Sequence, residues 1–140
     1  MTFTYPEGGP AADLLVEATG ATLGEAFANV ALGMFNAITP LDGISEEEKF
    51  SVEADGDDLD SLLFNLIDEF LYLNDVEYLV PRRIEMTVDE RRFHAEALCA
   101  GERFSRDTHE TGIAVKAATY HMMSIGRESG GWRVRMVFDT

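Results

Sequence analysis

Residues 57–73 read DDLDSLLFNLIDEFLYL, and residues 84–99 read IEMTVDERRFHAEALC. In the first stretch, large apolar residues recur every three or four positions, which is the spacing of a helix with one buried face. Asp57 and Asp58 precede these residues, at the place where the start of a helix favours negative charge. In the second stretch, apolar and polar residues alternate on both sides of Asp89-Glu90, which is typical of two strands joined by a turn. The change of period predicts a helix packed against antiparallel strands.

A second helix is predicted over residues 22–38. Thr22 and Glu25, three residues apart, form a capping-box pattern, and apolar residues at helical spacing follow them up to Ile38. Thr39-Pro40 ends this helix, because the residue before a proline avoids the α region.

The remaining segments predict strands and turns. Strands are expected at residues 14–20, 46–54, 113–127 (with a bend near Tyr120-His121) and 132–138, loops at Gly8-Gly9-Pro10 and 101–111, and a tight hairpin at Ser129-Gly130-Gly131. The fold class is therefore α+β, with two main helices packed on a largely antiparallel β-sheet, in a single domain over residues 1–140.

The composition excludes several classes of protein. Of the 140 residues, 46% are hydrophobic, which is enough for a core and excludes a disordered acidic tail. No apolar run reaches the roughly 20 residues of a membrane span, and the first residues do not resemble a signal peptide. Cys99 is the single cysteine, so no intrachain disulfide is possible and a reducing, cytoplasmic setting is expected. One cysteine and three separated histidines make a Cys/His zinc site improbable.

The charge is strongly negative and unevenly distributed. The formal net charge is −15, and residues 1–80 contain 17 acidic residues and a single basic one, Lys49. Such a surface repels phosphate, so we expect neither tight direct binding of nucleic acid nor binding to a membrane. The acidic half suits docking to a basic partner, and it equally suits a salt-rich cytoplasm.

Three acidic positions are candidates for a binding site. Asp13 precedes an apolar strand, although an ordinary turn Asp would also fit there. Glu69 lies about 20° from Leu62 around the helix, at the margin of the buried face, whereas Asp68 points to the solvated side. A carboxylate at this margin either has a partner or simply reaches water. Asp139 is next to Thr140 and its carboxylate, and a frayed terminus is the alternative. If Asp13 and Asp139 converge, their oxygens form a site that prefers Ca²⁺ or Mg²⁺ to zinc.

The segment VKAATYH at residues 115–121 contains two further candidates, Lys116 and His121. His121 shares strand parity with Thr119 and is expected to face inward, where it is either a hydrogen-bonded core residue or a ligand. His109-Glu110, in the polar loop upstream, is interpreted as solvated surface. The sequence contains no nucleophile-elbow or phosphate-loop motif, and Cys99 has no activating neighbour.

Several of these segments resemble the archease family. Ala12-Asp13 resembles its H-T-A-D segment, and residues 22–35, TLGEAFANVALGMF, resemble its T-L-E-E-A-F-E-N-A-A-L-G-L-F helix. Residues 56–59 together with residues 66–73 resemble its second helix, VKAATYH resembles its V-K-A-x-T-Y-H strand, and Phe138-Asp139 resembles its terminus. The chain departs from the family at Pro10-Ala11, where His-Thr usually precedes Ala-Asp.

The resemblance implies an accessory protein, not an enzyme. Archeases act with the RtcB-type RNA ligase of tRNA splicing, promoting its guanylylation and its multiple turnover. By position, the resemblance implies a divalent cation, calcium above all, at Asp13 and Asp139 beside Thr140. It also makes Glu69, Lys116 and His121 candidates for ligase activation.

Two alternatives remain open at the level of sequence. The first is a chaperone-like protein that keeps a tRNA methyltransferase soluble and specific. The second is a metal-dependent enzyme with Asp13, Glu69 and Asp139 as ligands and Lys116 or His121 as the acid–base group, which the missing nucleotide and nucleophile motifs disfavour.

Overall fold

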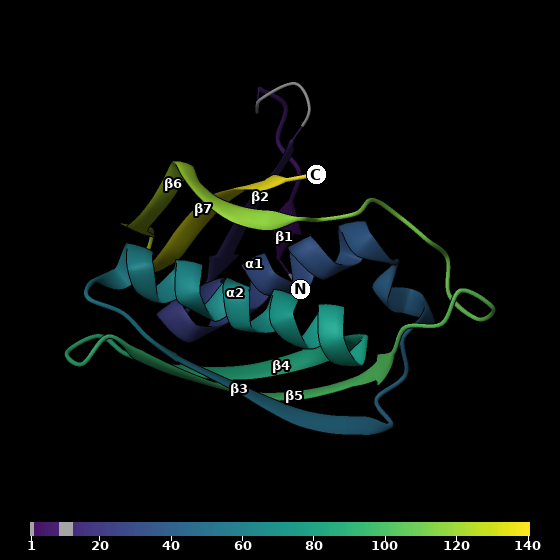
Figure 1. Cartoon of the computed structure of the whole chain (residues 1–140). Coiled ribbons are helices and arrows are strands. Elements are labelled where there is room, and N and C mark those ends of the chain that lie inside the picture. Colours follow the sequence, from purple (N-terminus) through teal and green to yellow (C-terminus); the bar gives the residue numbers. More distant parts are fainter. Residues whose placement is uncertain (1, 9–12) are drawn as a thin grey trace.

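Two antiparallel β-sheets enclose two long helices in the computed structural model of the chain, which describes residues 2–8 and 13–140 (Figure 1). One sheet has the strand order β1-β2-β7-β6, and the other has the order β3-β5-β4. The elements are β1 (Phe3–Thr4), β2 (Leu14–Gly20), α1 (Leu23–Ile38), the 3-10 helix η1 (Leu41–Gly43), β3 (Glu48–Asp55), α2 (Leu59–Glu77), β4 (Leu79–Asp89), β5 (His94–Arg103), β6 (Ala117–Glu128) and β7 (Gly131–Asp139).

The α+β fold class is confirmed, and the strands are divided between two sheets where the sequence predicted one. An alternating pattern specifies which side chains face the core, but it does not specify which strands pair. The short strand β1, Phe3–Thr4, was not predicted. The loop predicted at Gly8-Gly9-Pro10 lies partly outside the described residues, as do Ala11 and Ala12 of the family resemblance.

The helix α1 begins and ends where the sequence predicts. The Thr22 hydroxyl accepts a hydrogen bond from the backbone N–H of Glu25 at 3.1 Å, and the Glu25 carboxylate accepts one from the Ala21 N–H at 2.8 Å. These bonds satisfy N–H groups that a helix leaves unpaired at its start. Because α1 packs between β2 of one sheet and β4 of the other, it is buried on opposite faces.

The helix α2 covers the outer parts of both sheets, against β3 and β6. The Asp58 carboxylate accepts a hydrogen bond from the Ser61 N–H at 2.7 Å, so Asp58, the second of the two predicted N-terminal aspartates, caps this helix. Phe70 lies on its buried face, where its ring meets that of Phe35 from α1 edge to face, with 5.9 Å between centroids.

The strand β6 is interrupted by a bulge. Thr119 pairs with Val137, and the next pair joins Ser124 to Arg135, so four residues of β6 lie opposite one residue of β7. Met122, inside the bulge, has a φ of 59°. The bend predicted near Tyr120-His121 is therefore confirmed, although β6 begins at Ala117 and not at residue 113.

The β6–β7 hairpin is also confirmed. Ser129 and Gly130 have φ values of 45° and 81°. Two consecutive positive φ angles are the requirement of a type I′ turn, whose twist matches that of the strands it joins.

Candidate functional site

Three of the predicted site residues lie together at the ends of neighbouring strands. In the β2–β7 pair the last partners are Leu14 and Phe138, so Asp13, which precedes Leu14, and Asp139, which follows Phe138, lie at the same end of two neighbouring strands. On the other side of β7, the backbone N–H of Lys116 donates a hydrogen bond to the Asp139 carbonyl at 2.8 Å. The antiparallel register therefore brings Asp13, Lys116 and Asp139, which are far apart in the sequence, to adjacent chain segments.

The side chains at this edge are accessible to a ligand. Phe138 is fully buried, whereas the next residue, Asp139, is exposed. Lys116 is exposed, whereas Asp13 and Thr140 are half-buried. Carboxylate oxygens are the hard donors that Ca²⁺ and Mg²⁺ prefer, so this donor set fits the cation that the resemblance implies.

Glu69 is an acid that reaches water, which is one of the two alternatives that the sequence left open. It is exposed on α2, and it makes no hydrogen bond or ion pair with Asp13, Lys116 or Asp139 among the described residues. Its neighbour Asp68 is exposed, as predicted, although partial burial raises the pKa of its carboxyl. No direct contact therefore joins Glu69 to the strand-end residues.

The prediction that His121 faces inward is wrong. His121 is exposed and lies within the bulge of β6, where the alternation of the strand is broken. Before the bulge, the buried side chain is that of Ala118 and not that of Thr119, so the parity used for the prediction was also shifted by one residue.

His109 was predicted to be solvated surface, and the structure shows the opposite. Its side chain is 2% exposed. Nδ1 accepts a hydrogen bond from the Ser105 N–H at 2.9 Å, so Nε2 is the nitrogen that donates to the Glu102 carboxylate at 2.8 Å. Glu102 also accepts from the Ser45 N–H, and this bond, followed by that from His109, lowers the pKa of Glu102. The two hydrogen bonds of His109 thereby stabilise the conformation of the loop after β5.

We expect the His109→Ala variant to lose about 1–3 kcal/mol of unfolding free energy, because Glu102 and the Ser105 N–H lose their partner in a buried place. Urea denaturation followed by circular dichroism measures this loss. His121→Ala is the control, because it removes an exposed histidine and should change the stability by less than about 0.5 kcal/mol. Equal losses for the two variants would contradict the role given to His109.

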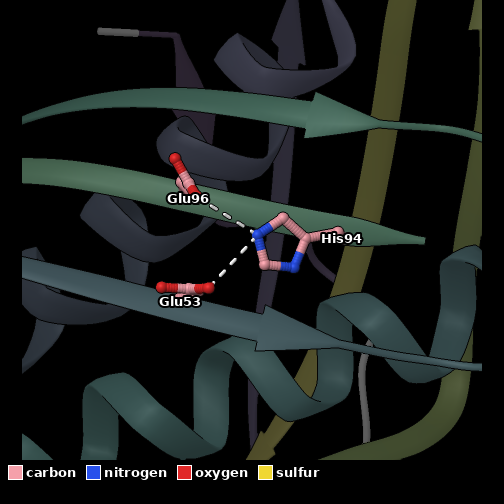
Figure 2. Close-up of side chains that lie close together, drawn as sticks. All are labelled: Glu53, His94 and Glu96. Carbon is pink, nitrogen blue, oxygen red and sulfur yellow. Dashed lines mark hydrogen bonds and ion pairs between the residues drawn. The ribbon is translucent and has the colours of Figure 1, made fainter. Parts of the chain in front are cut away.

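A second group of polar side chains lies on the outer face of the β3-β5-β4 sheet. Glu53, His94 and Glu96 each offer a ligand atom, and these atoms lie within 4.8 Å of one another (Figure 2). Their ligand atoms are close enough together to coordinate one metal ion. The sequence did not predict it, because Glu53 and His94 are neighbours only through the pairing of β3 with β5.

Cys99 is unsuited to act as a nucleophile. It is buried on β5, and burial raises the pKa of its thiol to about 12. The thiol is therefore protonated near neutral pH, whereas the reactive form is the thiolate.

None of the described helices combines the length and the apolar character that a membrane span requires.

Comparison with known proteins identifies relatives over nearly the whole chain. Residues 5–140 match the Archease protein family. The chain is 40% identical over 132 residues to "Protein archease-like" of Drosophila melanogaster, covering 91% of this chain and 85% of that one. It is 36% identical over 138 residues to "Protein archease" of Pyrobaculum neutrophilum, covering 96% and 94% of the two chains.

Solved structures share the fold. The solution structure of protein 1598 from Methanobacterium thermoautotrophicum matches with a TM-score of 0.82 at 32% identity, covering 99% of this chain and 97% of that one. The crystal structure of an archease from Thermotoga maritima, described there as a possible chaperone, matches with a TM-score of 0.58 at 19% identity, covering 98% of each chain. The second match shows the fold alone.

Proposed function

Since the chain belongs to the archease protein family, we propose that it is an accessory activator of the RtcB-type RNA ligase of tRNA splicing, acting in the cytoplasm. In this role it promotes guanylylation of the ligase and so allows each ligase molecule to complete many turnovers. The observation that carries the proposal is that Asp13, Lys116 and Asp139 lie together at the ends of neighbouring strands. At these three positions the sequence resembles the family's motifs.

In this proposal Asp13, Asp139 and Thr140 bind a divalent cation, calcium above all. The bound cation would supply a fixed positive charge at a surface that is otherwise acidic. The backbone N–H of Lys116 donates a hydrogen bond to the Asp139 carbonyl, and the ammonium group of the same residue is exposed. Lys116 is thereby positioned to meet an anionic group of the partner, such as a phosphate. Glu69 and His121 are exposed, and we assign them to contacts with the ligase and not to the cation.

The distribution of charge supports a protein partner. The first 80 residues contain 17 acids against one base, and an RNA-binding ligase needs a basic surface. Complementary fields of this kind mainly raise the rate of association. The buried, protonated Cys99 also fits a protein that assists a catalyst without being one.

The second candidate is a chaperone-like protein for a tRNA methyltransferase. It is favoured by large apolar side chains left in solvent near the end of α2, where Tyr72 is 60%, Val76 55% and Tyr78 58% exposed. Exposed apolar groups close together mark surfaces that bind other proteins.

A ligation time course with RNA in excess over the RtcB-type ligase, in the presence of GTP and Mn²⁺, tests the first candidate. We expect many turnovers per ligase molecule only when this protein is present. A stop after a single turnover in both reactions would contradict the activator role. A parallel assay of methyltransferase aggregation, scored by light scattering, separates the two candidates, because only the chaperone-like function predicts protection there.

A further inference from the structure

We propose that Glu53, His94 and Glu96 form a binding site for a divalent transition-metal ion of the zinc type, separate from the strand-end residues Asp13 and Asp139. The two glutamates are directly opposite each other in the β3–β5 pair, and His94 is opposite Asp55 in the same pair. The side chains of these three residues and of Asp55 project from the outer face of the sheet, because their neighbours along the two strands, Val52, Ala54 and Ala95, are buried.

The distances at His94 distinguish two kinds of interaction. Its Nδ1 lies 2.6 Å from an Asp55 carboxylate oxygen, which is a short hydrogen bond. Its Nε2 lies 3.4 Å from an oxygen of Glu53 and 3.3 Å from an oxygen of Glu96 (Figure 2). Both separations are long for a charge-assisted hydrogen bond. They equal the spacing of about 3.4 Å between neighbouring donors around a tetrahedral zinc ion with bonds of about 2.1 Å.

The Asp55 contact prepares Nε2 for a metal. In a neutral imidazole one nitrogen carries the proton and the other has a free lone pair. Because Asp55 accepts the proton of Nδ1, the lone pair of the neutral ring is on Nε2, on the side of the two glutamates. A carboxylate that holds the second nitrogen of a ligating histidine is the usual support of zinc ligands.

The local charge favours a dication. Glu53 and Glu96 are cross-strand neighbours of like charge, an arrangement that destabilises a sheet unless something compensates it. Among the described residues, no lysine or arginine forms an ion pair with Glu53, Asp55 or Glu96. One imidazole, which carries at most one positive charge, faces three carboxylates. A bound M²⁺ ion would neutralise the excess.

The donor set also selects the metal. One imidazole nitrogen and two carboxylate oxygens suit zinc, whereas a calcium ion prefers six to eight oxygens. The strand-end residues offer only oxygen. The two sites should therefore differ in preference, with zinc at His94 and calcium at Asp13 and Asp139.

Calorimetric titration of the full chain with Zn²⁺, at about pH 8 and with Ca²⁺ in excess to occupy oxygen-only ligands, tests the proposal. We expect one zinc ion per chain. His94→Gln and Glu96→Gln should weaken its binding by at least about tenfold, and Asp55→Asn, which removes the support and not a ligand, by a smaller factor. A rise of the melting temperature on adding zinc should be lost in the same variants.

Two matched substitutions control for non-specific binding. His121→Gln removes an exposed histidine from β6, and Glu110→Gln removes an exposed glutamate from the loop before it. Both should leave zinc binding unchanged. The proposal is overturned if the wild-type protein binds zinc without a defined stoichiometry, or if His94→Gln and His121→Gln weaken binding equally. Because His94 and both glutamates are surface side chains, circular dichroism should show the wild-type fold in every variant.

Discussion

The Phe70→Ala variant is expected to lower the free energy of unfolding by about 3–5 kcal/mol. Phe70 is 1% exposed and lies between the two helices, where its ring meets Phe35 edge to face. The substitution removes the aromatic contact with α1 and leaves a cavity in the buried core. Close-packed surroundings of this kind collapse only partly, so the loss includes a cavity contribution in addition to the transfer of the ring to water.

Urea denaturation of the wild-type and variant proteins measures the change. Phe64→Ala is the matched control, because Phe64 is on the same helix but is only half-buried and stacks on the exposed ring of Tyr120. We expect the control to lose about 1 kcal/mol. A loss at Phe70 no larger than that at Phe64 would contradict a core centred between the helices.

The second large effect is expected in ligase activation. Asp13→Ala and Asp139→Ala should each reduce the turnover of the RtcB-type ligase to nearly the level seen without this protein. Because each variant removes a proposed cation ligand, its affinity for calcium should fall by more than the 10–100-fold that is typical of losing a residue that only supports a ligand. Lys116→Ala should reduce turnover while leaving calcium binding intact, since the Asp139 carbonyl is held by the backbone of Lys116 and not by its side chain.

The ligation time course with excess RNA provides the measurement, and calcium titration of each variant provides the second readout. Asp107→Ala, an exposed aspartate in the loop before β6, is the control and should retain activation. Full activation by both Asp13→Ala and Asp139→Ala would contradict the proposed site. Loss of activation with unchanged calcium binding would indicate that the two residues contact the ligase and do not bind the cation.

The elements that the sequence predicted well are those determined by local interactions. The Thr22 and Asp58 caps depend on hydrogen bonds within three residues, and the Ser129-Gly130 turn depends on two backbone angles. The bend of β6 near Tyr120 was also predicted. The division of the strands into two sheets was not, since it depends on pairings between distant segments.

The site residues divide in the same way. The sequence and the resemblance pointed to Asp13 and Asp139 but left open whether they converge, and their neighbouring places follow from the register of β2 and β7. The environments of single side chains were predicted poorly. His121 was expected inside and is exposed, because a bulge changes parity, and His109 was expected outside and is buried, because its loop folds back onto Glu102.

By itself, the sequence determined the two helices, their caps, most of the strands and the acidic character of the first half, because periodicity, capping and charge are encoded in neighbouring residues. The tertiary structure alone decided which carboxylates meet. Glu53 and Glu96 are opposite each other through one register of β3 and β5, and a slip of one residue would turn one of them into the core. That register is held by burial of Val52, Ala95 and Ala97 against the helices, a long-range free energy that no short stretch of sequence contains.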